Sequence, residues 1–131
     1  MTKILIVDDN RSVRAAFRMC FKMKTDWIVC GEAENGAAAV ELARDLKPDV
    51  VVLDYAMPVM NGLEAARALS VLAPECAIIM YTMFTAPDLS ALAHAAGVRT
   101  VLSKEVNGIG AVMEAIEAVA FGNAESCGAT G

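Results

Sequence analysis

Short apolar runs and longer amphipathic segments alternate strictly along this chain, and that alternation limits the folds it can adopt. The apolar runs have strand length and are rich in Ile and Val, while the segments between them repeat apolar residues at helical spacing. Because the connections are short, each helix crosses the sheet and returns the chain to a parallel strand. The pattern predicts an α/β fold, with one parallel sheet covered by helices on both faces.

Five strands and five helices are expected. The strands are predicted at 4–7, 28–33, 50–54, 77–81 and 98–102, and the helices at about 11–24, 36–46, 62–72, 86–96 and 109–120. Asn35 and Asn61 precede the second and third helices. Thr85 is predicted to cap the fourth helix, with Pro87 in its first turn.

The strands differ in a way that predicts their order in the sheet. The first, third and fourth strands are apolar throughout, as central strands of a parallel sheet should be. The second carries Gly31 and Glu32 and the fifth carries Arg99 and Thr100, which is typical of edge strands. The predicted order is therefore 2-1-3-4-5, the flavodoxin-like doubly wound sheet, whose ligands bind at the carboxyl ends of the strands between strands 1 and 3.

Length and composition favour one globular domain. The chain has 131 residues, of which 56% are hydrophobic and 21% charged, so it can bury a core. We expect a single domain over residues 1–121 and a flexible tail of small and polar residues over 122–131. No apolar run is long enough for a membrane span, and the apolar run near the start is too short for a signal peptide.

Charge and cysteine usage narrow the function classes. The net charge of −5 is opposite to that of a nucleic-acid-binding surface, which needs an excess of clustered Lys and Arg. The four cysteines show neither metal-ligand spacing nor a disulfide framework, so reduced thiols in a cytoplasmic protein are expected. Direct binding to nucleic acid or membrane is therefore not predicted.

Polar side chains follow four of the predicted strands. The first strand ends in Asp8 and Asp9, the third in Asp54, the fourth in Thr82 and the fifth in Lys104. Two unit charges 4 Å apart repel by roughly 4 kcal/mol at an effective dielectric constant of 20, so three convergent carboxylates need protons or a cation. An all-oxygen site of this kind suits a hard divalent cation, above all Mg²⁺.

The same polar residues allow plainer interpretations than a metal site. Asp54 alone could simply end a strand, and the whole edge could be a solvated acidic rim with Lys104 as a counter-charge. A flavodoxin-type nucleotide site is disfavoured because Asp8 and Asp9 would repel phosphate, and no P-loop or G-x-G-x-x-G motif occurs. Since the edge offers no further substrate chemistry, a dedicated metabolic enzyme is not expected.

From Lys3 to about Ala120 the chain resembles the receiver domain of two-component response regulators. The matching motifs are the acidic pair Asp8-Asp9, Asp54 followed by Met57-Pro58 and Asn61-Gly62, Thr82 after the fourth strand, and Lys104 after the fifth. The segments around Thr82 and Lys104 are most similar to receivers of the class with helix-turn-helix output domains (LuxR/FixJ-like). Such an output domain is absent from this sequence.

The resemblance implies a role for each site residue. Asp54 would be the phosphoacceptor that takes a phosphoryl group from the phosphohistidine of a histidine kinase. Asp9, Asp54 and the backbone carbonyl of Ala56 would hold Mg²⁺, and Asp8 would act on it through bound water. Lys104 would pair with a phosphoryl oxygen. Thr82 would move to bond another oxygen and so report phosphorylation.

The same resemblance implies partners and exposes one departure. A histidine kinase or a phosphotransfer protein would be the partner, and a homodimer of receivers is a further possible assembly. The family usually has Tyr or Phe three residues before the lysine, but this chain has Val101. The alternative to a phosphorylation switch is therefore a receiver-like scaffold or dimerisation module that does not switch.

Overall fold

The chain folds around one five-stranded parallel sheet. The computed structural model describes the backbone of residues 1–83 and 86–130 and the side chains of residues 1–83 and 86–120. The strands are β1 (Thr2–Val7), β2 (Trp27–Ala33), β3 (Val50–Leu53), β4 (Ala77–Thr82) and β5 (Thr100–Ser103). They lie in the order β2-β1-β3-β4-β5, which confirms the predicted doubly wound sheet.

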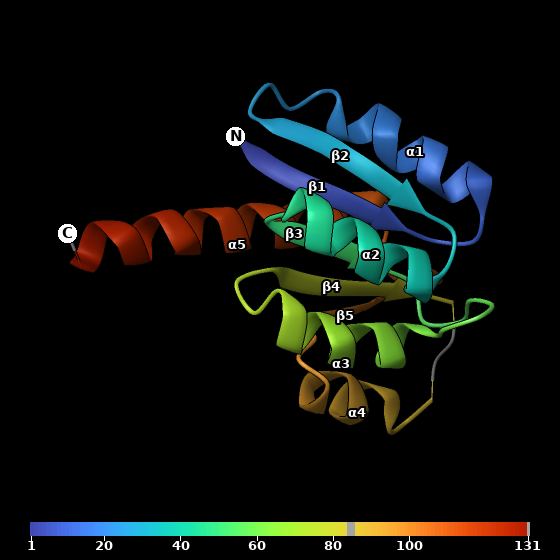
Figure 1. Ribbon diagram of the computed structural model, residues 1–131. Coiled ribbons are helices and arrows are strands. Elements are labelled where there is room, and N and C mark those ends of the chain that lie inside the picture. Colours follow the sequence, from blue (N-terminus) through green and yellow to red (C-terminus); the bar gives the residue numbers. More distant parts are fainter. Residues whose placement is uncertain (84–85, 131) are drawn as a thin grey trace.

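Among the described residues, four helices connect the strands, a fifth follows β5, and together they cover both faces of the sheet. They are α1 (Arg11–Phe21), α2 (Gly36–Leu46), α3 (Gly62–Leu72), α4 (Leu89–Ala95) and α5 (Ile109–Thr130). In Figure 1, α2, α3 and α4 lie on the near side of the sheet, whereas α5 passes behind it. The strand arrowheads point toward the same edge, which is therefore the carboxyl edge of the sheet.

Each face of the sheet has its own hydrophobic core. On one face, alternate strand residues such as Leu5 and Val51 pack with the buried side chains of α2, α3 and α4. On the other face, Ile6 and Val52 pack with Phe17 of α1 and with the buried residues of α5. Because successive strand residues point to opposite faces, a strand buried on both faces must be apolar throughout. This is why the central strands read as unbroken apolar runs.

Asparagine caps start the first three helices just beyond the carboxyl edge. The side chains of Asn10, Asn35 and Asn61 each accept a hydrogen bond from a backbone N–H in the first turn of the following helix. Asn61 also shares a reciprocal capping box with Glu64. The caps satisfy N–H groups that would otherwise lack partners, so they fix where each loop ends and its helix begins.

Two predicted boundaries near α4 were wrong. The helix begins at Leu89, after Asp88, which makes no side-chain cap; the predicted cap residue Thr85 lies outside the described residues. The strand β5 begins at Thr100 rather than at residue 98, because Val98 donates its N–H to the carbonyl of Ala93 at 2.9 Å. Val98 therefore belongs to the helix end, where Gly97 has a φ of 101°.

The predicted C-terminal ends of the first and last helices also differ from the structure. Helix α1 ends at Phe21, three residues before its predicted end at 24, and α5 continues to Thr130 rather than ending near 120. The division into a domain over 1–121 and a flexible tail over 122–131 stays a prediction, because the side chains from 121 onward and the whole of residue 131 lie outside the described part. Within that part, none of the helices is both long and apolar enough to cross a bilayer.

Candidate phosphoacceptor and metal site

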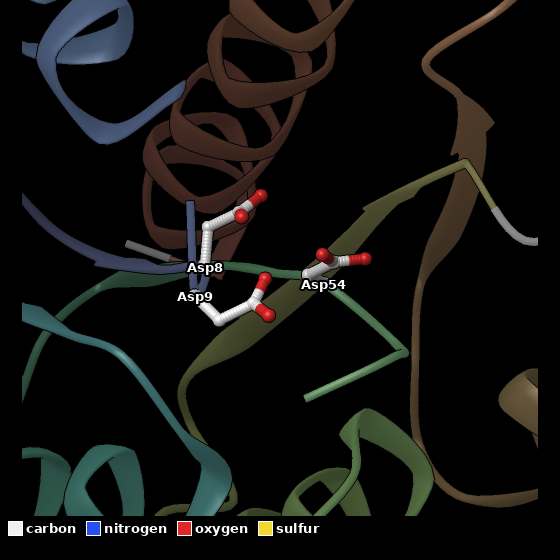
Figure 2. Close-up of side chains that lie close together, drawn as sticks. All are labelled: Asp8, Asp9 and Asp54. Atoms are coloured by element: carbon white, nitrogen blue, oxygen red, sulfur yellow. The ribbon is translucent and has the colours of Figure 1, made fainter. Parts of the chain in front are cut away.

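Three carboxylates meet at the carboxyl edge between β1 and β3. Asp8 and Asp9 follow β1, and Asp54 follows β3 (Figure 2). Strand pairing continues past the strand ends, since Asp8 donates its N–H to Ala33 and Asp54 donates its N–H to Val7, each at 3.0 Å. One carboxylate oxygen from each of the three aspartates lies within 4.8 Å of the others. The backbone of the sheet thus determines how closely these charges approach.

Lys104, which follows the edge strand β5, reaches the same cluster across the end of β4. Its Nζ lies 2.6 Å from Oδ2 of Asp8 and 3.3 Å from Oδ2 of Asp54. Its backbone N–H donates to the carbonyl of Thr82 at 2.9 Å, which anchors the start of the loop after β5 to the end of β4. The predicted site residues Asp8, Asp9, Asp54 and Lys104 are therefore together in space, although they come from distant parts of the chain.

Burial and neighbouring charges shift the pKa values of Asp8 and Lys104. Burial of the Asp8 carboxyl raises its pKa above the ordinary value; the hydrogen bond from Lys104 opposes that rise, and the charge of Asp54 adds to it. Burial of the Lys104 ammonium lowers its pKa, but the two carboxylates outweigh burial and leave the pKa raised. Lys104 therefore stays charged at neutral pH, where it compensates part of the acidic cluster.

The donor set fits a small hard cation. Asp8 and Asp54 are buried and Asp9 is exposed, so the cluster opens to solvent on one side. Carboxylate oxygens with room for water are what Mg²⁺ prefers, because it binds few protein ligands and keeps several waters. The acidic pocket expected from the sequence is thus present. Ala56 lies two residues after Asp54 in an exposed part of the loop, and the role of its carbonyl stays a prediction.

Thr82 lies at the other half of the edge, at the end of β4, and is 1% exposed. Beside it is a pocket of about 280 Å³ between α4 and β5. Val101 lines this pocket from β5 and Leu89 lines it from α4. The position at which the sequence departs from the family pattern therefore borders open space next to Thr82. The sensor role of Thr82 stays a prediction.

Sequence reasoning missed one cation beside the site. Arg14 lies on α1, and its side chain is only 14% exposed. Its Nη1 donates to the carbonyl of Asp8 at 2.5 Å, and its Nε lies 3.3 Å from Glu32. The available signal was that Arg14 and Arg18 occupy one face of the helix opposite the only acidic residue of β2, which both contact.

Sequence reasoning also missed the reason for a glycine after Asp54. Gly62 begins α3 and donates its N–H to the carbonyl of Tyr55 at 2.8 Å. A Cβ atom here would lie 2.8 Å from Cα of Tyr55 and would overlap the carbonyl oxygen of Asp54. Only a residue without a side chain lets the helix begin this close to Asp54.

Comparison with known proteins agrees with this geometry. The family model described as "Response regulator receiver domain" matches residues 4–117. The chain belongs to this family of receiver domains. A putative transcriptional regulator of Pseudomonas aeruginosa is 34% identical to this receiver domain over 107 residues, which cover 82% of this chain and 51% of the relative.

Solved structures of response regulators share the fold. A LuxR-family two-component response regulator from Aurantimonas sp. SI85-9A1 superposes with a TM-score of 0.85 at 29% identity, covering 93% of this chain and 87% of that one. The response regulator domain of Thermotoga maritima CheB superposes with a TM-score of 0.80 at 28% identity, covering 91% and 93%. The receiver domain spans about half or less of the first curated relatives, between 28% and 51% of their lengths.

Proposed function

We propose that this receiver domain is a signalling switch of a two-component system that accepts a phosphoryl group on Asp54. The observation that carries the proposal is the approach of Lys104 to Asp54, at 3.3 Å, beside the carboxylates of Asp8 and Asp9. An isolated lysine–aspartate pair would neutralise itself, but this cluster holds two further carboxylates. The arrangement supports a site for a cation and a phosphoryl group together.

The transfer itself needs only displacement at phosphorus. A carboxylate oxygen of Asp54 forms the new O–P bond while the N–P bond of a phosphohistidine breaks, and the electron pair of that bond stays on the imidazole nitrogen. The product is an aspartyl phosphate. The donor is a histidine kinase or a phosphotransfer protein, which makes such a protein the proposed partner, and a homodimer of receivers is a second proposed assembly.

The remaining site residues would bind Mg²⁺ and orient the phosphoryl group. Asp9, Asp54 and the Ala56 carbonyl would hold Mg²⁺ directly, and Asp8 would hold its water ligands. When bound, the ion neutralises negative charge on the oxygens of the transferring phosphoryl group. Lys104 carries a fixed positive charge to the other side of that group, and the hydroxyl of Thr82 bonds one of its oxygens afterwards. Asp54 attacks as a carboxylate, so no proton has to leave the nucleophile during the transfer.

Phosphorylation with a small donor tests this function. The protein is incubated with MgCl₂ and acetyl phosphate, and its intact mass is measured over time. We expect an adduct of one phosphoryl group in the unaltered chain and none in Asp54→Ala. The matched control is Asp45→Ala, which removes an exposed aspartate on α2 and should leave the adduct intact. An adduct that persists in Asp54→Ala, or no adduct in the unaltered chain, contradicts the proposal.

One observation favours a second candidate, a receiver-like scaffold or dimerisation module that does not respond to phosphorylation. Val101 borders the open pocket beside Thr82, so no aromatic side chain at this position links Thr82 to the surface of β5. Backbone amide NMR signals with and without phosphodonor separate the two functions. A switch shifts the signals of α4 and β5, whereas a scaffold shifts only those of the loops around Asp54.

A further inference from the structure

The loop that carries Lys104 is closed by the residues on either side of it. Ser103 donates its N–H to Oδ1 of Asn107 at 3.0 Å, and Asn107 donates its N–H to the carbonyl of Ser103 at 2.7 Å. The hydroxyl oxygen of Ser103 also accepts the N–H of Glu105 at 3.2 Å. One asparagine thus satisfies both backbone groups of Ser103 and closes the turn in which Lys104 lies.

A tyrosine of β4 fastens this closed loop to the sheet. The hydroxyl of Tyr81 donates to the carbonyl of Asn107 at 2.9 Å. The ring is 7% exposed and packs edge-on against Phe17, with ring centroids 5.6 Å apart. Burial raises the pKa of Tyr81 above its ordinary value, so the hydroxyl keeps its proton and remains a donor at neutral pH.

The same tyrosine lies beside the lysine side chain. Nζ of Lys104 is 6.0 Å from the centroid of the Tyr81 ring, and the same atom contacts Asp8 and Asp54. Lysine has a long flexible stem, so its ammonium is placed accurately only where both the start of the stem and its course are held. The backbone bond to Thr82 and the Asn107 closure hold the start of the stem, and the Tyr81 ring lies near its ammonium end.

We propose that Tyr81 and Asn107 are positioning residues for Lys104. They hold its ammonium next to Asp54 at the place where charge on an incoming phosphoryl group has to be compensated. This inference rests on the proposed function, since it assigns a role to Lys104 in phosphoryl transfer. A small displacement of such a group lowers the rate of transfer because the reacting atoms must be aligned and their charge matched before reaction.

Acetyl phosphate again provides the measurement. A carboxylate oxygen of Asp54 forms the O–P bond while the bond from phosphorus to the acetyl oxygen breaks, and acetate leaves with the electron pair. Tyr81→Phe removes the hydroxyl and keeps the ring, and Asn107→Ala removes the side chain that closes the loop. We expect each change to lower the phosphorylation rate constant about five- to tenfold, the loss expected for one hydrogen bond. The affinity for Mg²⁺ should stay within about twofold, since neither residue belongs to the acidic cluster.

Phe17→Leu is the matched control for a purely structural role. It removes the aromatic partner of Tyr81 but leaves the hydroxyl bond to Asn107 in place, so it should lower the melting temperature without changing the rate of the folded protein. In a Lys104→Ala background, Tyr81→Phe should cause no further loss of rate, because the residue it positions is gone. A rate in Tyr81→Phe and Asn107→Ala within twofold of the unaltered chain overturns the inference.

A measurement without phosphodonor separates this inference from the proposed function. The ¹⁵N signal of the Lys104 Nζ should be observable in the unaltered chain, because its contacts with Asp8 and Asp54 slow proton exchange. Tyr81→Phe should shift or broaden that signal, and Phe17→Leu should not. If the unaltered chain forms no adduct, the proposed function fails while this signal still decides the positioning. An unchanged signal in Tyr81→Phe contradicts it.

Discussion

The two halves of the carboxyl edge are built by different means. The metal half comprises the loops after β1 and β3 and contains Asp8, Asp9 and Asp54. The switch half comprises the ends of β4 and β5 with the loops after them, and contains Thr82, Val101 and Lys104. Backbone groups and glycines hold the metal half, whereas side chains hold the switch half and leave a pocket of about 280 Å³.

Close backbone contacts confine the loop after β3 in the metal half. Gly36, at the start of α2, donates its N–H to the carbonyl of Met60 at 3.1 Å, and a Cβ on Gly36 would lie 2.5 Å from that oxygen. In the same loop Val59 has a φ of 70°, and Met60 donates its N–H to Pro58 at 2.7 Å across it. A β-branched residue in this conformation is strained, so the surrounding contacts must hold it there.

The switch half depends on the particular side chains of this chain. The bond from the Tyr81 hydroxyl to the Asn107 carbonyl and the bond from the Ser103 N–H to the Asn107 amide oxygen each depend on one side chain, so a single substitution at Tyr81 or Asn107 removes one of them. The pocket beside Val101 gives the neighbouring side chains room to rearrange. The difference shows that backbone geometry holds the acidic cluster, whereas the loop of Lys104 and the surroundings of Thr82 also depend on side chains that sequence can change.

The largest effect is expected from replacing a glycine of the metal half with alanine, which tests whether backbone crowding holds that half. Gly62→Ala should lower the free energy of unfolding by about 3 kcal/mol or more, because the new Cβ overlaps the Asp54 carbonyl and a backbone atom rather than a movable side chain. Urea unfolding measures the loss. Gly110→Ala is the control: it also lies in a first helical turn, meets nothing within 4 Å, and should gain up to about 1 kcal/mol. Equal effects would mean that Gly62 is not tightly confined.

Magnesium should stabilise the fold through the metal half alone. A ligand at 100 times its dissociation constant that binds only the folded state adds about 2.7 kcal/mol to the free energy of unfolding. We expect a gain of that size at saturating MgCl₂, measured by urea unfolding. Asp9→Asn should remove more than half of it, because a carboxylate of the cluster is lost. Asp45→Asn on α2 should keep it in full. A full gain in Asp9→Asn would place the ion elsewhere.

The pocket in the switch half should accommodate a phenylalanine side chain at position 101 without loss of stability. Val101→Phe places the added atoms toward the pocket beside Thr82, so the free energy of unfolding should rise by up to about 1 kcal/mol and should not fall. Val52→Phe is the matched control, because Val52 is 2% exposed within the core against α1 and α5, and overpacking there should cost about 1–3 kcal/mol. A comparable loss in both variants would show that the pocket is not available to residue 101.

Much of the fold and site followed from local patterns. Unbroken apolar runs identified the three central strands, and polar residues in β2 and β5 identified the edges. Once that order is known, Asp8, Asp9, Asp54 and Lys104 are all expected at one edge, since parallel strands end at the same side of the sheet. The predicted start of β5 was wrong because Val98 donates its N–H to Ala93 and not to the sheet. The predicted start of α4 was also wrong, since the helix begins only after Asp88, which makes no side-chain cap.

Other site features had no readable pattern. The contact of Arg14 with Asp8 and that of Tyr81 with Asn107 join residues of different elements, and no periodicity predicts such pairs. Nothing in the neighbouring sequence shows where a long side chain will end. Gly62 was visible as a helix start, but the carbonyl that excludes its Cβ comes from the backbone turn after Asp54.

The amino-acid sequence by itself determined the order of the strands and the meeting of the acidic residues with Lys104. It could do so because burial and chain connectivity act through regular periods that a sequence displays. Only the tertiary structure decided how these residues are held: the backbone crowding around Asp54 and the bond from Tyr81 that fastens the Lys104 loop. Such contacts depend on distances of a few tenths of an ångström between distant segments, and these distances are set only when the whole core has packed.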